Sequence, residues 1–451
     1  MTKPRYPCGS AAGSKVRGIA SSPGDYAWNV NFNNGNANYN HQDNKGLVRA
    51  VRARECQDVS LRDLHTAWSR ARRAKRPSAN QLNFDTHWLD HLLDLQRRLN
   101  AGTWSPAPPT CFIATLPKAR EIHAPDFVDR VVHHWLVPQI EAIYEDAFIH
   151  DSFSNRIGKG THAAVARLRS FVRQVHSGQG GGWYLQLDVR NFFNSIHRPT
   201  LYALLKQRID RHGLPTVVRR TTHALLRFSP IAGGVRYVGT QAERARVPAH
   251  KRLENAAPGC GLAIGNLSSQ FFANVYLDAL DQFVKHELRA PRYLRYVDDF
   301  VLVHDSREQL QAWQRQIESF LRERLRLELK ADIRLKPLPS GCDFLGYVVY
   351  PTHIVVRRRV IAHARDRLAA WQRQHVHGSR IRATPAQLEV FRSVWHSYDG
   401  HFAHANVHRL LRRFHAEYPW LNAAARPQRL SHRPDHRHVQ RDFVFWDLDA
   451  G

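Results

Sequence analysis

The sequence has 451 residues, which is too long for one ordinary hydrophobic core and predicts roughly two to four subdomains. Its 66 Lys and Arg against 39 Asp and Glu give a net charge of +27, which favours a nucleic-acid partner over a merely basic, soluble surface. The five cysteines are scattered, without CxxC spacing, which argues against a disulfide framework or a cysteine zinc site and suits the cytoplasm. No apolar run could cross a bilayer, and the start lacks a signal-peptide core, so we expect no membrane association.

The chain begins with a Gly/Ser/Asn-rich leader, residues 1–60, which contains the stretch NVNFNNGNANYN. Eight asparagines fall between Asn29 and Asn44. As protein, this stretch could be an Asn-rich loop, an amyloid-prone polar tract, or strand and turn from a folded module. We expect the leader to be poorly ordered or loosely attached to the rest of the chain.

Helical and strand patterns then follow in an uneven order. Helices are predicted by apolar periodicity and by capping residues: from Asp85 to a C-cap at Gly102, with Leu89 and Leu93 in its apolar set; from Thr161; across Phe272 to Phe283; from Ser306; and from Thr384 to Gly400. Strands are predicted by alternation or short apolar runs at CFIATL, WYLQLDV, RYLRYVDDFVLV and FLGYVVY. An irregular basic insertion lies at residues 229–261. Because helices do not separate the strands evenly, the pattern favours an α+β, palm-like sheet over a doubly wound one.

Two groups of carboxylates occur at the ends of predicted strands. Asp188 ends an apolar strand, and Asp298 and Asp299 lie at the tip of a hairpin with apolar arms. An Asp-Asp dipeptide alone is most often a solvated turn. Adjacent carboxylates beside buried strands usually persist because a cation neutralises them. The pattern therefore predicts a hard-oxygen site suited to Mg²⁺, where two ions about 4 Å apart could activate a 3′-hydroxyl.

These motifs resemble those of reverse transcriptases. Tyr296-Val297-Asp298-Asp299 is similar to the family's YxDD motif, and LDVRNFFNSI is similar to its first palm aspartate motif. DRVVHHWL, SFSNRIGKGTHAAV, FLGY and GHFAHAN also fall in the family's order, so the resemblance runs from about residue 60 to 420. It implies an α+β right-hand polymerase fold with these subdomains: fingers at 61–180, a palm of antiparallel sheet plus helices at 181–350 with an insertion at 206–260 returning to the fingers, a helical thumb at 351–420, and a basic tail at 421–451.

The resemblance also implies site residues. Those that would hold two Mg²⁺ ions are Asp188, the Val189 carbonyl and Asp298, with Asp299 alongside. Those that would contact the incoming nucleotide are Lys118, Arg120, Phe193, Ile264, Gly265, Gln270 and Lys330. Phe193 matches the position that excludes a ribose 2′-hydroxyl, and Lys330 matches a lysine near the leaving group. The segment that would grip the primer is Phe344, Leu345, Gly346 and Tyr347. Each basic residue alone would more often be surface charge.

One motif indicates a subfamily. Most reverse transcriptases have QGxxxSP where this chain has IGNLSSQ, from Ile264 to Gln270. This form resembles reverse transcriptases of diversity-generating retroelements, which copy a template RNA into cDNA from dNTPs with errors at adenines and work with a small basic accessory variability protein. Isoleucine cannot hydrogen-bond the template or nucleotide, which would penalise mispairing less. Alternatively, Ile264 and Gln270 are neutral differences between lineages.

Two other interpretations stay open. One is a retron-type or phage-defence reverse transcriptase, against which the IGxxxSQ form speaks. The other is a maturase-like RNA-binding protein with a vestigial polymerase site, which the intact aspartates disfavour.

Two segments near the C-terminus have more than one interpretation. The segment HSYDGHFAHANVHRLLRRF could grip a duplex or be thumb core with a solvated face, with equal weight. The tail residues His432, His436 and His438 favour disorder over metal binding.

The leader fits the retroelement interpretation in an unexpected way. Its sequence DYAWNVNFNNGNANYNHQDNKGLVRAVR resembles the C-terminal end of lectin-like and formylglycine-generating-enzyme-like domains, which such retroelements diversify. Asparagine codons begin with two adenines, so an adenine-mutable template would encode an Asn-rich stretch. We therefore hypothesise that residues from about 22 to 54 are a template repeat read in frame with the polymerase.

Overall fold

The computed structural model describes residues 58–73, 77–115, 118–179, 181–378 and 380–425, together with the backbone of three strands between residues 15 and 41. The chain divides into two compact units. Unit 1 comprises Met1–Ala107, Pro125–Ile140 and Leu205–Ser229; unit 2 comprises Pro108–Ala124, Glu141–Leu204 and Pro230–Gly451. Part of the expected insertion, residues 206–229, therefore groups with the N-terminal helices, whereas residues 230–260 group with unit 2. The subdomain boundaries and the assignment to fingers, palm and thumb stay predictions.

Unit 1 consists mainly of helices. They are α2 (Leu61–Arg72), α3 (Ala79–Thr86), α4 (Trp88–Ala101), α9 (Thr216–Arg227), the start of α5 (Phe127–Glu145) and the end of α8 (Arg198–Arg211). The predicted C-cap of α4 is confirmed, since Gly102 is left-handed with φ of 72°. Leu89 and Leu93, which belong to the predicted apolar set of this helix, do not face the core, because both side chains are exposed. Leu92, Leu95 and Leu99 supply the buried face instead.

Part of the leader has a described backbone. Strands β1 (Lys15–Ile19), β2 (Tyr26–Asn31) and β3 (Ala37–His41) form an antiparallel sheet in the order β1-β2-β3. The β2–β3 register pairs Trp28 with Tyr39 and Val30 with Ala37. The other leader residues up to residue 57 lie outside the described part, so poor order and a template repeat both stay predictions.

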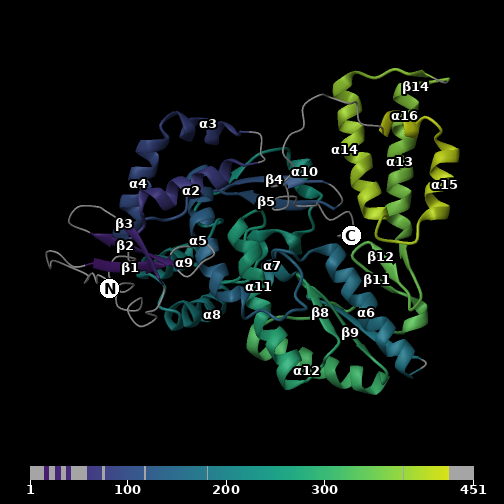
Figure 1. The fold of residues 1–451 in the computed structure, drawn as a ribbon, viewed down its shortest axis with the longest axis horizontal. Helices are drawn as coiled ribbons and strands as arrows, with labels where there is room; N and C mark the ends of the chain where they lie inside the picture. The colour runs from purple at the N-terminus through teal and green to yellow at the C-terminus, as the bar shows by residue number, and fades with distance from the viewer. Residues whose placement is uncertain are drawn as a thin grey trace. The chain divides into compact units, whose positions relative to one another are not determined.

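The central feature of unit 2 is a four-stranded antiparallel sheet (Figure 1). Its order is β10 (Arg334–Pro337), β6 (Trp183–Asp188), β9 (Asp299–His304) and β8 (Tyr293–Tyr296). Helix α6 (Thr161–Gln179) packs on β8 and β9, and α12 (Arg307–Leu325) packs on β6 and β9. Tyr184, Val301 and Val303 join the buried cluster that includes α6. Since side chains alternate along a strand, Asp188 and Asp299 belong to the same face as these three residues.

Several short elements surround this sheet in unit 2. A second sheet has the order β5-β4-β7, with β4 and β5 antiparallel and β4 and β7 parallel. The remaining elements up to α12 are β4 (Thr110–Ala114), β5 (Arg120–Ala124), α7 (Phe192–Ser195), β7 (Arg236–Tyr237), α10 (Gln241–Ala245), η1 (Ala249–Lys251), η2 (Leu253–Asn255), α11 (Leu267–Gln282) and the π-helix η3 (Phe283–Glu287).

The C-terminal part of unit 2 is a small sheet followed by helices. Its elements are η4 (Leu338–Ser340), β11 (Cys342–Phe344), β12 (Tyr347–Val349), β13 (Ile354–Val356), α13 (Arg358–His375), β14 (Val376–His377), β15 (Arg380–Ile381), α14 (Pro385–Phe402), α15 (His408–Glu417) and α16 (Leu421–Ala425). The predicted cap of α14 is confirmed, since Thr384 and Gln387 form a capping box. One buried apolar cluster joins α6, the β11–β13 sheet and these helices. Figure 1 shows α13, α14 and α15 side by side. The three tail histidines lie outside the described residues.

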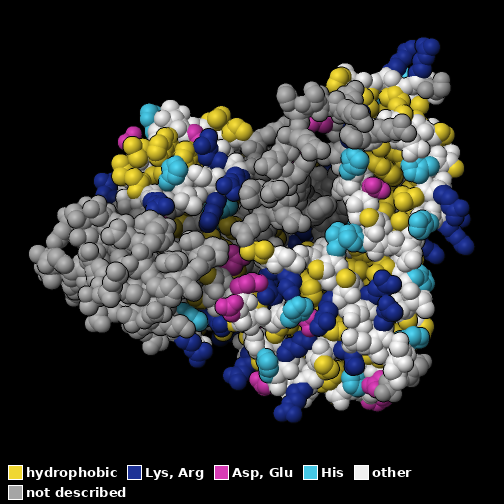
Figure 2. All heavy atoms as spheres, in the orientation of Figure 1, with side chains coloured by type: hydrophobic (Ala, Val, Ile, Leu, Met, Phe, Trp, Pro, Cys, Tyr) yellow, Lys and Arg dark blue, Asp and Glu magenta, His cyan; other side chains and the backbone are white. Residues whose placement is uncertain are grey.

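Helices and antiparallel sheets together confirm the predicted α+β class. Within the described residues, no helix is both long and apolar enough to span a membrane. Lys and Arg side chains are dispersed over the visible described surface in Figure 2 rather than confined to one element. The positive charge is therefore distributed along the fold, as the sequence indicates.

Candidate active site

The pairing of β6 with β9 brings the three aspartates to one end of the central sheet. Asp188, the last residue of β6, lies directly opposite Asp299, the first residue of β9. Asp298 lies in the turn before β9, and the Val189 N–H donates to the Asp298 carbonyl at 3.3 Å. The structure therefore brings together residues that are more than a hundred positions apart in the sequence.

The turn that carries Asp298 is strained. Tyr296 pairs with Asp299, so Val297 and Asp298 form a two-residue hairpin turn. Val297 has φ of 52°, in the left-handed region that a β-branched residue rarely occupies. A glycine is usual at the first central position of such a turn. Strain of this kind persists only where the surroundings hold it, and it is frequent at active sites.

Each strand aspartate has one polar partner. The Lys330 ammonium forms an ion pair with Asp188 Oδ2, and the Lys330 N–H donates to the Asp188 carbonyl at 2.8 Å. Asp188 Oδ1 is buried and has no hydrogen-bond partner. Gln186 Nε2 donates to Asp299 Oδ1 at 3.1 Å. One carboxylate oxygen is thus left available at the point where the strands meet.

Electrostatics at this end of the sheet favour an added cation. Burial, followed by the negative charge of Asp188, raises the pKa of Asp298. Burial, followed by the charges of Asp188 and Asp298, raises the pKa of Asp299 to about 8, although Gln186 opposes this. A divalent cation would offset the repulsion that raises both pKa values.

The residues present fit a small hard cation, although they do not form a closed cage. Among the described side chains, no group of three or more His, Cys, Asp or Glu is arranged as a metal site. A main-chain oxygen can complete the donor set. The N–H of Val189, the residue after β6, donates to the Asp298 carbonyl, so the Val189 main chain and its carbonyl oxygen lie beside Asp298. With Asp188 Oδ1 and Asp298, this oxygen makes a donor set that suits Mg²⁺, which retains water and substrate ligands.

Several cations lie near one another beside these carboxylates. Partial burial, followed by the charges of Lys251, Arg359, Lys330 and Arg120, lowers the pKa of Lys118. Lys118 is exposed, and Arg120 begins β5. The structure therefore brings Lys118, Arg120 and Lys330 into one electrostatic environment. Neighbouring positive charges repel one another, which lowers the pKa of Lys118. Such a cluster of cations is suited to binding a polyanionic ligand.

The IGNLSSQ segment is fixed against β5. The His123 N–H donates to the Ile264 carbonyl at 2.8 Å. Gly265 has φ of 117°, and a Cβ there would lie 2.9 Å from Ile122 Cγ2 and 3.3 Å from the His123 carbonyl oxygen. Only glycine suits this close approach. Ile264 is half-buried, and Gln270 lies in the first turn of α11.

Phe193 lies in the short helix α7, five residues beyond Asp188. Its ring meets that of Phe192 edge-on at 5.5 Å, and its carbonyl accepts from the Leu262 N–H at 2.9 Å. Phe192 is buried, whereas Phe193 is half-buried. This leaves part of the Phe193 ring available to a ligand, five residues beyond Asp188 and linked through Leu262 to the chain that leads into the IGNLSSQ segment.

The FLGY segment is a tight hairpin between β11 and β12. Phe344 pairs with Tyr347 across the strands, and Leu345 and Gly346 both have positive φ, of 49° and 86°. Phe344 and Tyr347 are buried in the cluster that joins this hairpin to α6 and the C-terminal helices. The Tyr347 hydroxyl donates to the His401 carbonyl at 2.7 Å. Leu345 is half-buried and packs against the same cluster, and Gly346 is buried, so within this segment only part of Leu345 is accessible to a partner.

Sequence reasoning missed several residues near the site. Gln186 shares a strand face with Asp188, so period-two alternation could have identified it. Lys251 and Arg359 come from the insertion and from α13, and neither position carries a signal of its own. Arg295 is a charged residue at an inward position of an apolar strand. A charge at such a position indicates a buried polar partner, and this mismatch is the feature of the sequence that could have identified Arg295.

The chain matches a family model described as "Reverse transcriptase (RNA-dependent DNA polymerase)" over residues 114–349. That span contains the central sheet and all three aspartates. Together with the observed palm-type sheet of antiparallel strands, the match confirms the expected α+β polymerase fold.

Two curated relatives are similar at low identity. Protein YkfC of Escherichia coli is 22% identical over 275 residues, covering 54% of this chain and 64% of that protein. The group II intron-encoded protein LtrA of Lactococcus lactis is 22% identical over 293 residues, covering 55% of this chain and 48% of that protein. The match therefore covers less than two thirds of either relative.

Among solved structures, apo telomerase from Candida tropicalis truncated from its C-terminal domain aligns with a TM-score of 0.42 and 9% identity, covering 60% of each chain. Telomerase from Candida albicans in complex with a fragment of telomeric RNA aligns with a TM-score of 0.40 and 12% identity, covering 71% of this chain and 55% of that one.

Proposed function

Because this chain belongs to the reverse transcriptase (RNA-dependent DNA polymerase) family, we propose that it copies an RNA template into complementary DNA. The observation that carries this proposal is the register that sets Asp188 opposite Asp299, with Asp298 in the adjoining turn. The family match and the group II intron-encoded relative support an RNA-directed DNA polymerase. A vestigial site would not be expected to keep all three carboxylates at one end of a buried sheet.

Reverse transcriptases generally use divalent metal ions, and we propose two Mg²⁺ ions here. Asp188, the Val189 carbonyl and Asp298 would hold them, with Asp299 kept alongside by Gln186. When bound, such ions would lower the pKa of the primer 3′-hydroxyl and neutralise the departing pyrophosphate. The strained Val297 turn would fix the direction of Asp298, and the unpartnered Asp188 Oδ1 would supply a ligand without breaking an existing hydrogen bond.

Other residues would bind the substrates. Lys118 and Arg120 would contact the triphosphate of a dNTP, and Lys330 would lie near the leaving pyrophosphate. The half-buried ring of Phe193 would exclude a ribose 2′-hydroxyl and so favour DNA synthesis. The hairpin of Phe344, Leu345, Gly346 and Tyr347 would support the primer, with Leu345 as the one side chain of the four that keeps part of its surface exposed.

Primer extension on an RNA template with Mg²⁺ tests the polymerase. The change Asp298→Asn should reduce cDNA synthesis by about 10⁴-fold, because it removes a charge that the transition state requires. Asp305→Asn is a matched control, since Asp305 follows the far end of the same strand and is exposed. If Asp298→Asn extends primers as well as the wild-type chain, the proposed mechanism is wrong.

We further propose that the polymerase belongs to a diversity-generating retroelement and makes errors at adenines. The support is the IGNLSSQ segment, in which Ile264 presents an apolar side chain at a position held by the His123 N–H. An isoleucine offers shape without a hydrogen-bonding group, so a mispaired adenine would lose less binding energy relative to the correct pair.

Sequencing the cDNA made by Ile264→Gln tests this subtype. The added amide should lower the misincorporation rate opposite adenine by about tenfold, at the scale of one hydrogen bond to a substrate. Ile264→Val is the matched control, because it stays apolar and should leave the adenine error unchanged. Equal adenine error in Ile264→Gln and wild type would rule out this role for Ile264.

The same proposal includes partners and a genetic arrangement. We propose a structured template RNA, a small basic accessory variability protein and a cytoplasmic site of action. We also propose that residues from about 22 to 54 are a translated template repeat. The surrounding DNA provides the check: a nearby near-copy of this segment should differ chiefly at adenines, and finding none would contradict the template-repeat hypothesis.

A further inference from the structure

Arg295, on β8, has a fully buried side chain, with 0% of its surface exposed. It lies three residues before Asp298 and two before the strained Val297. An arginine is almost never fully buried unless it is paired, because removing its charge from water is costly. Its partners therefore indicate what the fold gains by keeping it there.

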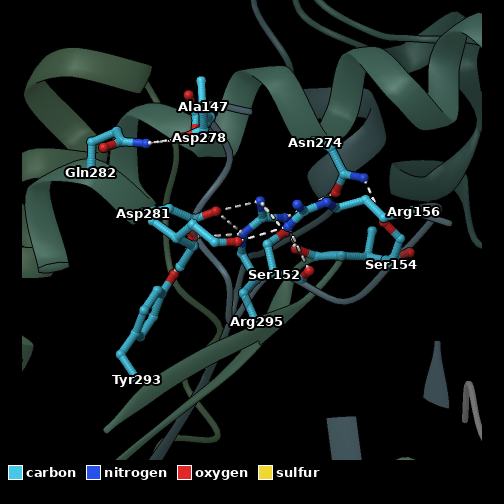
Figure 3. Close-up of polar contacts among 12 residues, drawn as sticks. Ala147, Ser152, Ser154, Arg156, Asn274, Asp278, Asp281, Gln282, Tyr293 and Arg295 are labelled. Atoms are coloured by element: carbon cyan, nitrogen blue, oxygen red, sulfur yellow. Dashed lines mark hydrogen bonds and ion pairs between the residues drawn. The ribbon is translucent and has the colours of Figure 1, made fainter. Parts of the chain in front are cut away.

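All five N–H donors of the Arg295 guanidinium have an acceptor (Figure 3). Nε donates to Asp281 Oδ1 at 2.8 Å, and Nη2 donates to Asp281 Oδ2 at 2.6 Å. Nη2 also donates to Ser152 Oγ at 3.2 Å. Nη1 donates to Asn274 Oδ1 at 3.2 Å and to the Val297 carbonyl at 2.9 Å. No donor is free to turn elsewhere, so the guanidinium has one orientation.

The acceptors are themselves held. Asp281, on α11, is also fully buried, and its Oδ1 accepts from the Tyr293 hydroxyl at 2.6 Å. Burial disfavours the charged form of Arg295, but the Asp281 carboxylate more than offsets this and holds the pKa of Arg295 above its ordinary value. The Arg295 main chain pairs with the segment beside it, because its N–H donates to the Asp151 carbonyl at 2.9 Å. The pair is therefore a fixed point in unit 2.

The bond from Nη1 to the Val297 carbonyl joins this fixed point to the catalytic turn. That carbonyl belongs to the peptide group that leads into Asp298. A valine at φ of 52° would relax toward negative φ unless its peptide were held. Holding the Val297 carbonyl therefore fixes the conformation of the turn and the orientation of the main chain at Asp298.

We propose that Arg295, anchored by Asp281, is a positioning residue that holds the Val297–Asp298 peptide in the geometry needed for catalysis. This inference rests on the proposed polymerase function. An arginine is required because its planar fork reaches Asp281 and the Val297 carbonyl from different nitrogens. A lysine would keep the charge and could pair with Asp281, but its single nitrogen cannot reproduce both contacts.

Primer-extension kinetics on two matched variants test the proposal. Arg295→Lys should lower kcat about tenfold or more and change the KM for dNTP by less than about twofold, because substrate binding is not affected. Tyr293→Phe removes a bond to the same Asp281 oxygen but none to the turn. It should lower the melting temperature yet leave kcat within about twofold of the wild-type value. An equal fall of kcat in the two variants would overturn the proposal.

A third variant, with three substitutions, separates an effect on the geometry of the turn from an effect on stability, even if Arg295→Lys folds poorly. Replacing the pair by apolar residues, as Arg295→Met with Asp281→Leu and Tyr293→Phe, can preserve folding, because a buried ion pair is often replaceable in this way. We expect a melting temperature near that of the wild type with kcat still about tenfold lower. Recovery of kcat together with melting temperature would mean that the pair is only structural. A wild-type chain that makes no cDNA would contradict the proposed function and this inference together; an active wild type with either contrary result would contradict this inference alone.

Discussion

Unit 2 contains two aspartate–cation pairs that involve its central sheet: Arg295, on β8, pairs with Asp281, and Asp188, at the end of β6, pairs with Lys330. Asp281 and Arg295 have side chains with none of their surface exposed, whereas Asp188 and Lys330 keep 32% and 47% exposed. In the first pair, every guanidinium donor has a partner. In the second, Asp188 Oδ1 has none. The two pairs carry the same charges, but the side chains of the first are held in one arrangement, whereas those of the second can change partners.

The difference indicates what each pair can do. A buried pair with several directed hydrogen bonds cannot be exchanged without breaking the surrounding structure, so it fixes a backbone in place. An exposed lysine is a flexible point charge that water, a metal ion or a phosphate can replace. We therefore propose that the rigid pair holds the turn that carries Asp298, whereas the exchangeable pair lies where substrates would bind.

The largest expected effect comes from breaking the rigid pair. Asp281→Ala should lower the free energy of unfolding by about 3 to 5 kcal/mol, because it leaves the Arg295 charge buried and unpaired. Urea unfolding measures this. Asp278→Asn, on the same helix, is the control. The Asp278 charge also raises the pKa of Arg295, but less than the Asp281 charge does, and an amide can still accept from Gln282, so this variant should cost less than about 1 kcal/mol. Equal losses in the two variants would mean that Arg295 does not depend on Asp281.

The exchangeable pair should behave in the opposite way. Lys330→Gln should change the free energy of unfolding by less than about 1 kcal/mol, because surface ion pairs contribute little. It should lower kcat about 10²-fold, the scale of losing one group that stabilises developing charge. Single-turnover primer extension and urea unfolding measure the two effects. Lys336→Gln, an exposed lysine on β10, should change neither. A Lys330→Gln variant that loses stability but not rate would reverse the comparison.

The sequence predicted the carboxylates of the site more completely than their support. Asp188 could be identified because strand alternation ends on it, and Asp298 with Asp299 because apolar arms flank them. The Arg295 partners could not be identified, since Ser152 lies 143 positions away and no local pattern links the two. Leu89 and Leu93 were misassigned for a related reason: helical periodicity identifies an apolar stripe but not which of its edges another element covers.

Unit 1 contains a third buried aspartate, Asp129, which accepts a hydrogen bond from a main-chain N–H rather than pairing with a cation. Asp129 is 3% exposed, and its Oδ2 accepts from the Ala107 N–H at 2.7 Å. Burial raises the pKa of Asp129 to about 7, despite that hydrogen bond. Because this pKa is above the unfolded value of about 3.9, the stability that the protonated carboxyl contributes is complete below the unfolded pKa. It is lost as the pH rises through about 7.

Asp129→Asn should therefore have a pH-dependent effect of roughly 2 to 3 kcal/mol between pH 5 and pH 8, because about two pH units of that interval lie below the folded pKa and each corresponds to about 1.4 kcal/mol. The amide resembles the protonated acid and can still accept from Ala107, so at pH 5 the variant and the wild type should have similar free energies of unfolding. At pH 8 the variant should have the higher free energy of unfolding. In the wild type the buried Asp129 carboxyl must either ionise or stay protonated above its pKa, and both lower the stability of the folded state. Urea unfolding at both pH values measures the gap, and Asp90→Asn, at an exposed position on α4, should show the same difference from wild type at each. A gap for Asp129→Asn that does not widen with pH would show that the groups around Asp129, the Ala107 N–H first among them, stabilise its charged form, as Arg295 stabilises Asp281.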